Sequence, residues 1–191
     1  MNLAVKRIAA VQGAASPLIQ STLLAFAQQL SRQGLRVAGV VEISSCGDEG
    51  RCKSLSVRDL ASGDTYPITQ KLGAGSEACN LDPGGLALAC GVIEDAIQRG
   101  VDVVVLSKFG KLEAARSGLC DAFRAAMMAD IPVITAVSPP VAEDWDRFAG
   151  ELAQSVEARV DALAEWWEFQ SEHIECGQRA IGARASAWAR A

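Results

Sequence analysis

The sequence predicts a three-layer α/β domain with a mainly parallel sheet and a small β-hairpin insertion. Apolar runs typical of strands alternate with segments in which apolar residues recur at helical spacing. Four of the first five residues from Val101 are valine, which indicates a strand buried on both faces of a parallel sheet. Within residues 44–70, two short alternating runs are separated by Ala-Ser-Gly-Asp, which is typical of a hairpin at a sheet edge.

The first part of the chain has a strand–helix–strand pattern. Residues 6–12 form an apolar run that predicts the first strand. Ser16 is then a candidate helix cap, with proline at the next position. Apolar residues recur at helical spacing up to Gly34, which can end the helix, and residues 35–43 predict the second strand.

After the hairpin, the cap-then-proline pattern recurs at Asp82, which predicts a helix that continues to about Gln98. The valine-rich strand from Val101 follows it. Ser117 is a candidate cap for a helix that ends near Asp130.

The C-terminal part begins with another buried strand over residues 131–137. From Trp145 to Trp167, apolar residues again recur at helical spacing, which predicts one helix. We therefore expect one domain over residues 1–168, which includes the hairpin insertion, and a C-terminal tail over residues 169–191.

The composition limits the functional classes. The chain has 191 residues, half of them hydrophobic, and a net charge of −5, which argues against general nucleic-acid binding. No stretch approaches the roughly 20 apolar residues that a membrane helix needs, so we expect a cytoplasmic protein. Arg179, Arg184 and Arg190 in the tail have no acidic neighbour. They suggest a solvated segment or a surface for a protein partner or homo-oligomer.

The turn after the first strand lies where a nucleotide-binding protein would have its phosphate loop. The Walker A motif G-x-x-x-x-G-K-[ST] needs a lysine after its second glycine. Here Gly13 matches the first glycine, but the region of the lysine has Ile19-Gln20 and no lysine. Free backbone amides at Ala14, Ala15 and Ser16, beside the positive end of the helix, could still bind an anion. An ordinary strand-to-helix turn explains the same residues equally well.

A second candidate segment is the polar end of the valine-rich strand. Ligands of open α/β sheets collect beyond the carboxyl ends of such strands. Here Ser107 and Lys108 come first, and Lys111 and Glu113 follow. We interpret Lys108 as an oxyanion or phosphate ligand, with Glu113 orienting it or a water molecule. The alternative is a surface salt bridge of little energetic value.

The six cysteines are Cys46, Cys52, Cys79, Cys90, Cys120 and Cys176. The first three lie in polar loops and are weak candidates for a soft-metal or redox site, whereas Cys90 and Cys120 have apolar surroundings. No C-x-x-C pair occurs and the single histidine lies in the tail, so a zinc site or a cysteine nucleophile has little support.

Three segments carry a resemblance to a known family: Gly75–Pro83, Val57–Gly63 and Lys108–Glu113. Together they resemble a bacterial family of unknown function whose members are described as nucleotide-binding and whose genes are often beside molybdenum transport genes. The resemblance covers roughly residues 5–150 and implies a P-loop-like fold, but it implies no particular reaction.

More distantly, the layout resembles the small P-loop nucleoside-triphosphatases of thermophiles. In that family the corresponding strand is followed by an acidic pair and then by Ile-Gly-x-Met-Glu. Only Gly110 and Glu113 match this motif, and Ser107 and Lys108 stand in place of the acidic pair. The loss of the loop lysine and of the metal-binding acids argues against magnesium-dependent hydrolysis.

The leading hypothesis is a protein that binds a small molybdate-like oxyanion or a nucleotide phosphate without fast turnover. Its site would combine Gly13–Ser16 with Lys108, and Ser76, Cys79 and Asp82 would form one wall. The residues identify no catalytic group and no cofactor. The alternatives are a slow nucleoside-triphosphate hydrolase with a degenerate phosphate loop, and a regulatory or scaffold subunit that docks a partner through its tail.

Overall fold

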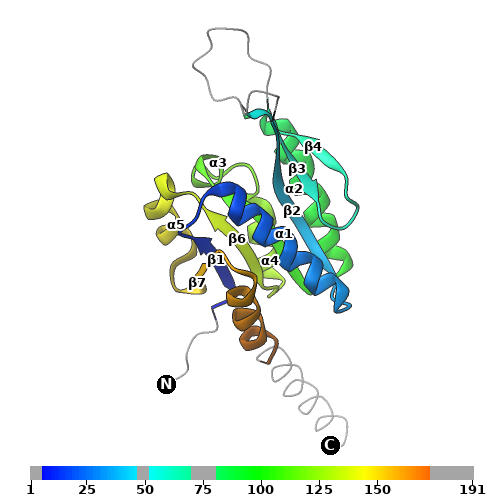
Figure 1. Cartoon of the computed structure of the whole chain (residues 1–191), viewed down its shortest axis with the longest axis vertical. Coiled ribbons are helices and arrows are strands. Elements are labelled where there is room, and N and C mark those ends of the chain that lie inside the picture. Colours follow the sequence, from blue (N-terminus) through cyan, green and yellow to red (C-terminus); the bar gives the residue numbers. More distant parts are fainter. Residues whose placement is uncertain (1–5, 47–51, 70–80, 173–191) are drawn as a thin grey trace, which may run out of the picture.

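A seven-stranded sheet with the strand order β4-β3-β2-β5-β6-β1-β7 forms the centre of the fold (Figure 1). The computed structural model describes residues 6–46, 52–69 and 81–172. The strands are β1 (Ile8–Gln12), β2 (Val37–Cys46), β3 (Cys52–Asp59), β4 (Thr65–Pro67), β5 (Val103–Phe109), β6 (Val133–Val137) and β7 (Ala153–Glu157). The helices are α1 (Ser16–Arg32), α2 (Pro83–Arg99), α3 (Lys111–Ala114), α4 (Cys120–Met128) and α5 (Ala142–Ala149), followed by a helix over residues 160–172 and joined by short 3₁₀ turns at Pro139–Val141 and Gly150–Leu152.

The sheet is mainly parallel, as predicted. β2, β5, β6, β1 and β7 pair in parallel, whereas β3 and β4 are antiparallel and add the hairpin at one edge. The buried valines of β5 lie in the middle of the sheet, which is why this run is apolar on both faces.

Helices cover both faces of the sheet and complete three layers. Alternate residues of β1 point to opposite sides: Ile8 and Ala10 pack against the core under α2, α4 and α5, and Ala9 and Val11 pack against the core under α1 and the final helix. The predicted three-layer α/β class is therefore confirmed. Among the described residues, no helix is long and apolar enough to span a membrane.

Two predicted helix caps differ from the structure, and one is confirmed. α1 is capped at Ala15 and the Ser16 hydroxyl makes no capping bond, although Pro17 does lie in the first turn. α4 begins after Leu119, and Ser117 contributes its backbone carbonyl rather than its hydroxyl. Asp82 does cap α2, because its side chain accepts a hydrogen bond of 2.9 Å from the Gly84 N–H.

The single helix predicted from Trp145 to Trp167 is wrong. α5 ends at Ala149, because Gly150 adopts a left-handed conformation with φ of 51°. The chain then forms β7, which pairs in parallel with β1 at the second edge of the sheet. Val156 is buried by this strand against the α1 side of the sheet, so its position in the helical pattern was a coincidence of spacing.

Candidate functional site

At the carboxyl ends of β1 and β6, the chain continues to opposite faces of the sheet. These strands are neighbours, yet α1 follows β1 onto one face of the sheet and α5 follows β6 onto the other. A crevice is expected outside the strands at such a point. The structure has a cavity of about 250 Å³ there, which we call the crevice cavity. It is lined by Gln12, Gly13, Ala14, Ser16, Ile19, Lys108, Ala136, Val137, Ser138, Pro139 and Ala142.

Three residues at the turn from β1 into α1, Gly13, Ala14 and Ser16, line this cavity. Within the described part of the chain, no group accepts a hydrogen bond from the N–H groups of Gly13, Ala14, Ala15 or Ser16. The carbonyl of Ala15 is used by the next turn of α1. Free N–H groups at the first turn of a 17-residue helix, together with the helix dipole, favour a bound anion.

The rest of this loop differs in structure from a Walker A loop. The positions of its lysine and hydroxyl are held by Ile19 and Gln20, both of which are buried. The Gln20 amide donates from Nε2 to the Ser107 carbonyl at 2.7 Å and accepts from the Glu42 N–H at 2.7 Å. It therefore joins β2 to β5 beyond Gly39 and Val105, the last pair of the ladder between these strands.

Lys108 forms an ion pair with Glu42 rather than with the predicted Glu113. The Lys108 Nζ lies 2.5 Å from the Glu42 Oε2, and the two side chains are 30% and 10% exposed. Sequence reasoning missed both Glu42 and Gln20. Glu42 is a single carboxylate within the apolar run of β2, and this pattern indicates a buried charge that needs a partner.

Glu113 is buried and caps a helix, and its carboxylate accepts hydrogen bonds from backbone N–H groups, not from Lys108 as the sequence had suggested. Its Oε2 accepts from the Gly110 N–H at 2.9 Å and its Oε1 accepts from the Leu119 N–H at 3.0 Å. Gly118 makes room for this arrangement: it has a φ of 62°, and a Cβ there would lie 2.2 Å from the Glu113 Oε1. The carboxylate thus connects both ends of the segment that contains α3.

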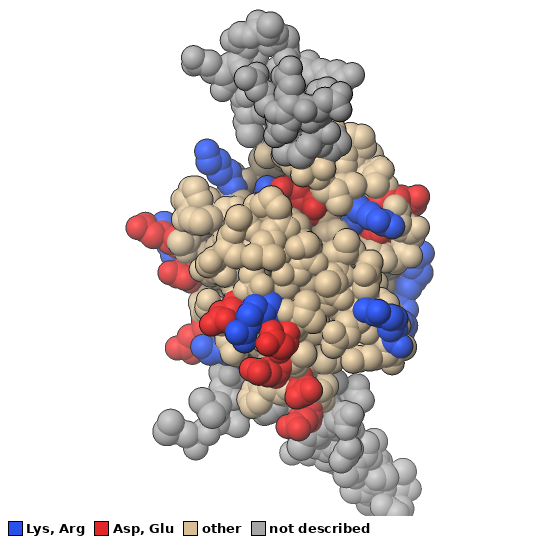
Figure 2. Space-filling model, in the orientation of Figure 1, with Lys and Arg blue, Asp and Glu red and all other residues tan. Residues whose placement is uncertain are grey.

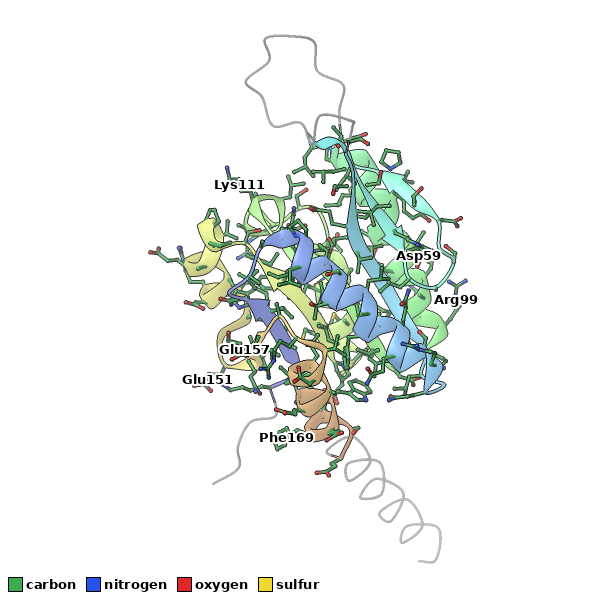
Figure 3. All side chains as sticks on the ribbon, viewed as in Figure 1. Asp59, Arg99, Lys111, Glu151, Glu157 and Phe169 are labelled. Atoms are coloured by element: carbon green, nitrogen blue, oxygen red, sulfur yellow. The ribbon has the colours of Figure 1, made fainter. Side chains whose placement is uncertain are left out.

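A second cavity of about 440 Å³ adjoins the crevice cavity, and we call it the apolar cavity. The two share Lys108, Ser138 and Pro139. Its lining contains the predicted Ser107, Lys108 and Glu113 together with Glu42, Ile68, Leu81, Leu86, Gly110, Lys111, Leu112, Ser138, Pro139, Pro140 and Val141. Figure 3 shows Lys111 at the outer side of α3, directed away from the sheet.

Attraction for an anion at these cavities must be local. The chain has a net charge of −5. On the face drawn in Figure 2, basic and acidic side chains are interspersed among uncharged ones. The local groups that could supply such attraction are the N–H groups of Gly13, Ala14 and Ser16 and the ammonium group of Lys108.

The remaining predicted site residues lie elsewhere or outside the described residues. Asp82 caps α2 and lines a separate hollow beside Tyr66, rather than either cavity at Lys108. Ser76 and Cys79 lie outside the described residues, as do the side chains of Cys46 and Cys52. Among the residues that the structure does describe, no three His, Cys, Asp or Glu side chains form a metal-binding group.

The two cysteines with described side chains, Cys90 and Cys120, are free thiols. Burial, and to a lesser degree the charge of Glu113, raises the pKa of Cys120 to about 11, and burial also raises the pKa of Cys90. The reactive thiolate is therefore scarce near neutral pH.

We expect iodoacetamide to leave both cysteines unmodified in the native protein at pH 7.5 and to modify them in urea. Peptide mass spectrometry checks this and separates them from the other four cysteines. Labelling of Cys120 in the native state at the rate seen in urea would contradict the assignment.

Comparison with known proteins places the chain in a family. The profile of the family described as "Protein of unknown function (DUF2478)" matches residues 8–166. The chain belongs to this family. The matched part of this DUF2478 chain starts with β1 and ends in the final helix, so it contains both cavities.

A curated relative links this DUF2478 chain to a larger protein. The chain is 35% identical over 169 residues to the molybdenum import ATP-binding protein ModC 2 of Bradyrhizobium diazoefficiens. The match covers 88% of the chain but 19% of the relative, so the chain spans about a fifth of the length of that protein. No solved structure matches the chain.

Proposed function

We propose that the crevice cavity binds a tetrahedral oxyanion group, either molybdate or the phosphate of a larger ligand, without fast turnover. One observation carries the proposal: Gly13, Ala14 and Ser16, whose N–H groups have no acceptor among the described residues, line a cavity that Lys108 also lines. Such a set of donors can surround an oxyanion, and the Lys108 ammonium group, which bonds Glu42 through one N–H, has two further donors for the same anion.

The residue types at this site favour binding over hydrolysis. In P-loop enzymes a loop lysine, a loop hydroxyl and an acid at a neighbouring strand end position the phosphate and Mg²⁺. Here Ile19 and Gln20 occupy the loop positions, and Lys108 lies at the carboxyl end of strand β5. Since the charge comes from a side chain, we expect anion binding to be independent of Mg²⁺.

The link to molybdenum rests on the relative. A segment similar to this chain makes up about a fifth of a protein named for molybdenum import and ATP binding. We infer that the present chain serves the same process, and molybdate is then the free oxyanion of first choice.

Thermal unfolding in the presence of molybdate, tungstate, sulfate, phosphate, ATP and GTP, each with and without Mg²⁺, tests the proposal. We expect molybdate and tungstate to stabilise the protein equally well in EDTA. A ligand at 100 times its dissociation constant adds about 2.7 kcal/mol to the free energy of unfolding, which is a shift of several degrees.

Absence of any shift with all six ligands would overturn the proposal. Stabilisation by a nucleotide that requires Mg²⁺, together with release of phosphate, would instead support the hydrolase alternative. Calorimetric titration of the ligands that shift the midpoint then gives the dissociation constants.

A further inference from the structure

The apolar cavity differs in chemistry from the crevice cavity, although the two meet at Lys108, Ser138 and Pro139. The crevice cavity is lined by Gly13, Ala14 and Ser16, whose N–H groups have no acceptor among the described residues. The apolar cavity is walled by aliphatic side chains from four separate parts of the fold. These are Ile68 after β4, Leu81 and Leu86 before and in α2, Leu112 in α3 and Val141 before α5.

Of the four charged residues that line the apolar cavity, Lys111 is exposed and the other three are already paired. Glu42 forms its ion pair with Lys108, and both carboxylate oxygens of Glu113 accept backbone hydrogen bonds. An apolar group that enters this cavity therefore displaces water from aliphatic surface without removing hydrogen bonds from these carboxylates. A bare oxyanion gains nothing from such a wall.

We propose that the natural ligand is an anion joined to a mainly apolar, ring-sized organic group, with the anion in the crevice cavity and the organic group in the apolar cavity. Lys108 lines both cavities and lies where the two parts of the ligand are joined. This inference rests on the proposed function and narrows its ligand class to organic phosphate esters or similar oxyanion esters. A ligand of this kind would contact the polar groups of the crevice cavity and the aliphatic wall of the apolar cavity at the same time. A free oxyanion would occupy only the crevice cavity.

Calorimetric titration of the full chain with inorganic phosphate, methyl phosphate and phenyl phosphate tests this inference. We expect phenyl phosphate to bind about tenfold or more tightly than inorganic phosphate, because the ring buries apolar surface, whereas methyl phosphate gains little. Equal affinities of the wild-type protein for phosphate and phenyl phosphate would overturn the inference and leave the proposed function standing.

Two space-filling variants separate the cavities, because Leu112 lines only the apolar cavity and Ala142 lines only the crevice cavity. Leu112→Trp should abolish the advantage of phenyl phosphate and leave the dissociation constant of inorganic phosphate unchanged within about twofold. Ala142→Trp should weaken both ligands. Equal loss of both ligands in Leu112→Trp would overturn the inference.

Leu112→Ala provides a second test in case tryptophan perturbs the fold. It should reduce the advantage of phenyl phosphate without affecting inorganic phosphate, and circular dichroism checks that both variants are folded. If no phosphate compound binds to the wild-type protein, the inference fails. The proposed function fails with it only when molybdate, tungstate and sulfate also leave the unfolding midpoint unchanged.

Discussion

Replacement of Lys108 by methionine should weaken oxyanion binding about 10- to 100-fold, because hydrogen bonds to charged groups contribute about 1.5–3 kcal/mol. Methionine keeps most of the apolar length of the side chain and removes only the ammonium group. The measurement is titration calorimetry with the oxyanion that stabilises the wild-type protein most. Binding by Lys108→Met as tight as that of the wild-type protein would remove Lys108 from the site.

A loss of binding in Lys108→Met must be separated from a loss of stability. The variant leaves the mostly buried Glu42 without its partner, which should cost about 1–3 kcal/mol of unfolding free energy. The double variant Glu42→Gln, Lys108→Met removes both charges, so it should recover stability without recovering binding. Lys111→Met is the matched control: this exposed lysine lines only the apolar cavity, so inorganic oxyanion affinity should remain within about threefold of the wild-type value.

Replacement of Glu113 by alanine should lower the free energy of unfolding by about 2–5 kcal/mol, because two backbone N–H groups lose their acceptor. For a chain of this length, the midpoint of thermal unfolding should then fall by about 5–15 °C. The effect is large because the carboxylate is almost fully buried and connects Gly110 to Leu119.

Two further variants test the same contact. Glu113→Gln keeps one oxygen acceptor but places an NH₂ group opposite the second N–H, so its loss should be intermediate. Gly118→Ala keeps the carboxylate but puts a methyl group against it, so it should also destabilise the protein. Unchanged stability in Glu113→Ala, or loss of a magnesium-dependent phosphatase activity in a stably folded Glu113→Gln, would contradict a purely structural role.

The location of the candidate site could be predicted from the sequence because its signals are local. The apolar runs of β1 and β5 end in polar residues, and parallel strands place those ends at one edge of the sheet. Lys108 and the loop from Gly13 to Ser16 were therefore predicted near one another, and the structure gives them a common cavity.

The partners within the site could not be predicted, because they depend on strand order. Glu42 is 66 residues from Lys108 in the chain, and it reaches Lys108 only because β2 lies beside β5. The bond between Glu113 and Gly110 is different, since a carboxylate three residues after a helix cap is a local signature. That spacing is a local signal for capping, although the hypothesis drawn from the sequence gave Glu113 the role of orienting Lys108.

The C-terminal misprediction has a similar cause. β7 has mostly exposed residues and a single buried valine, Val156, so it carries little of the alternation that identifies a strand. Its existence depends on pairing with β1, which lies about 145 residues earlier in the chain.

The amide of Gln20 limits how this protein could be converted into an enzyme. Glycine, lysine and threonine at positions 18, 19 and 20 would rebuild the sequence of a Walker A loop that starts at Gly13. The same change would remove the Gln20 amide that bridges β2 and β5. It would leave the Glu42 N–H and the Ser107 carbonyl without this partner. A route to hydrolysis by this scaffold would therefore need new partners for these two backbone groups of β2 and β5.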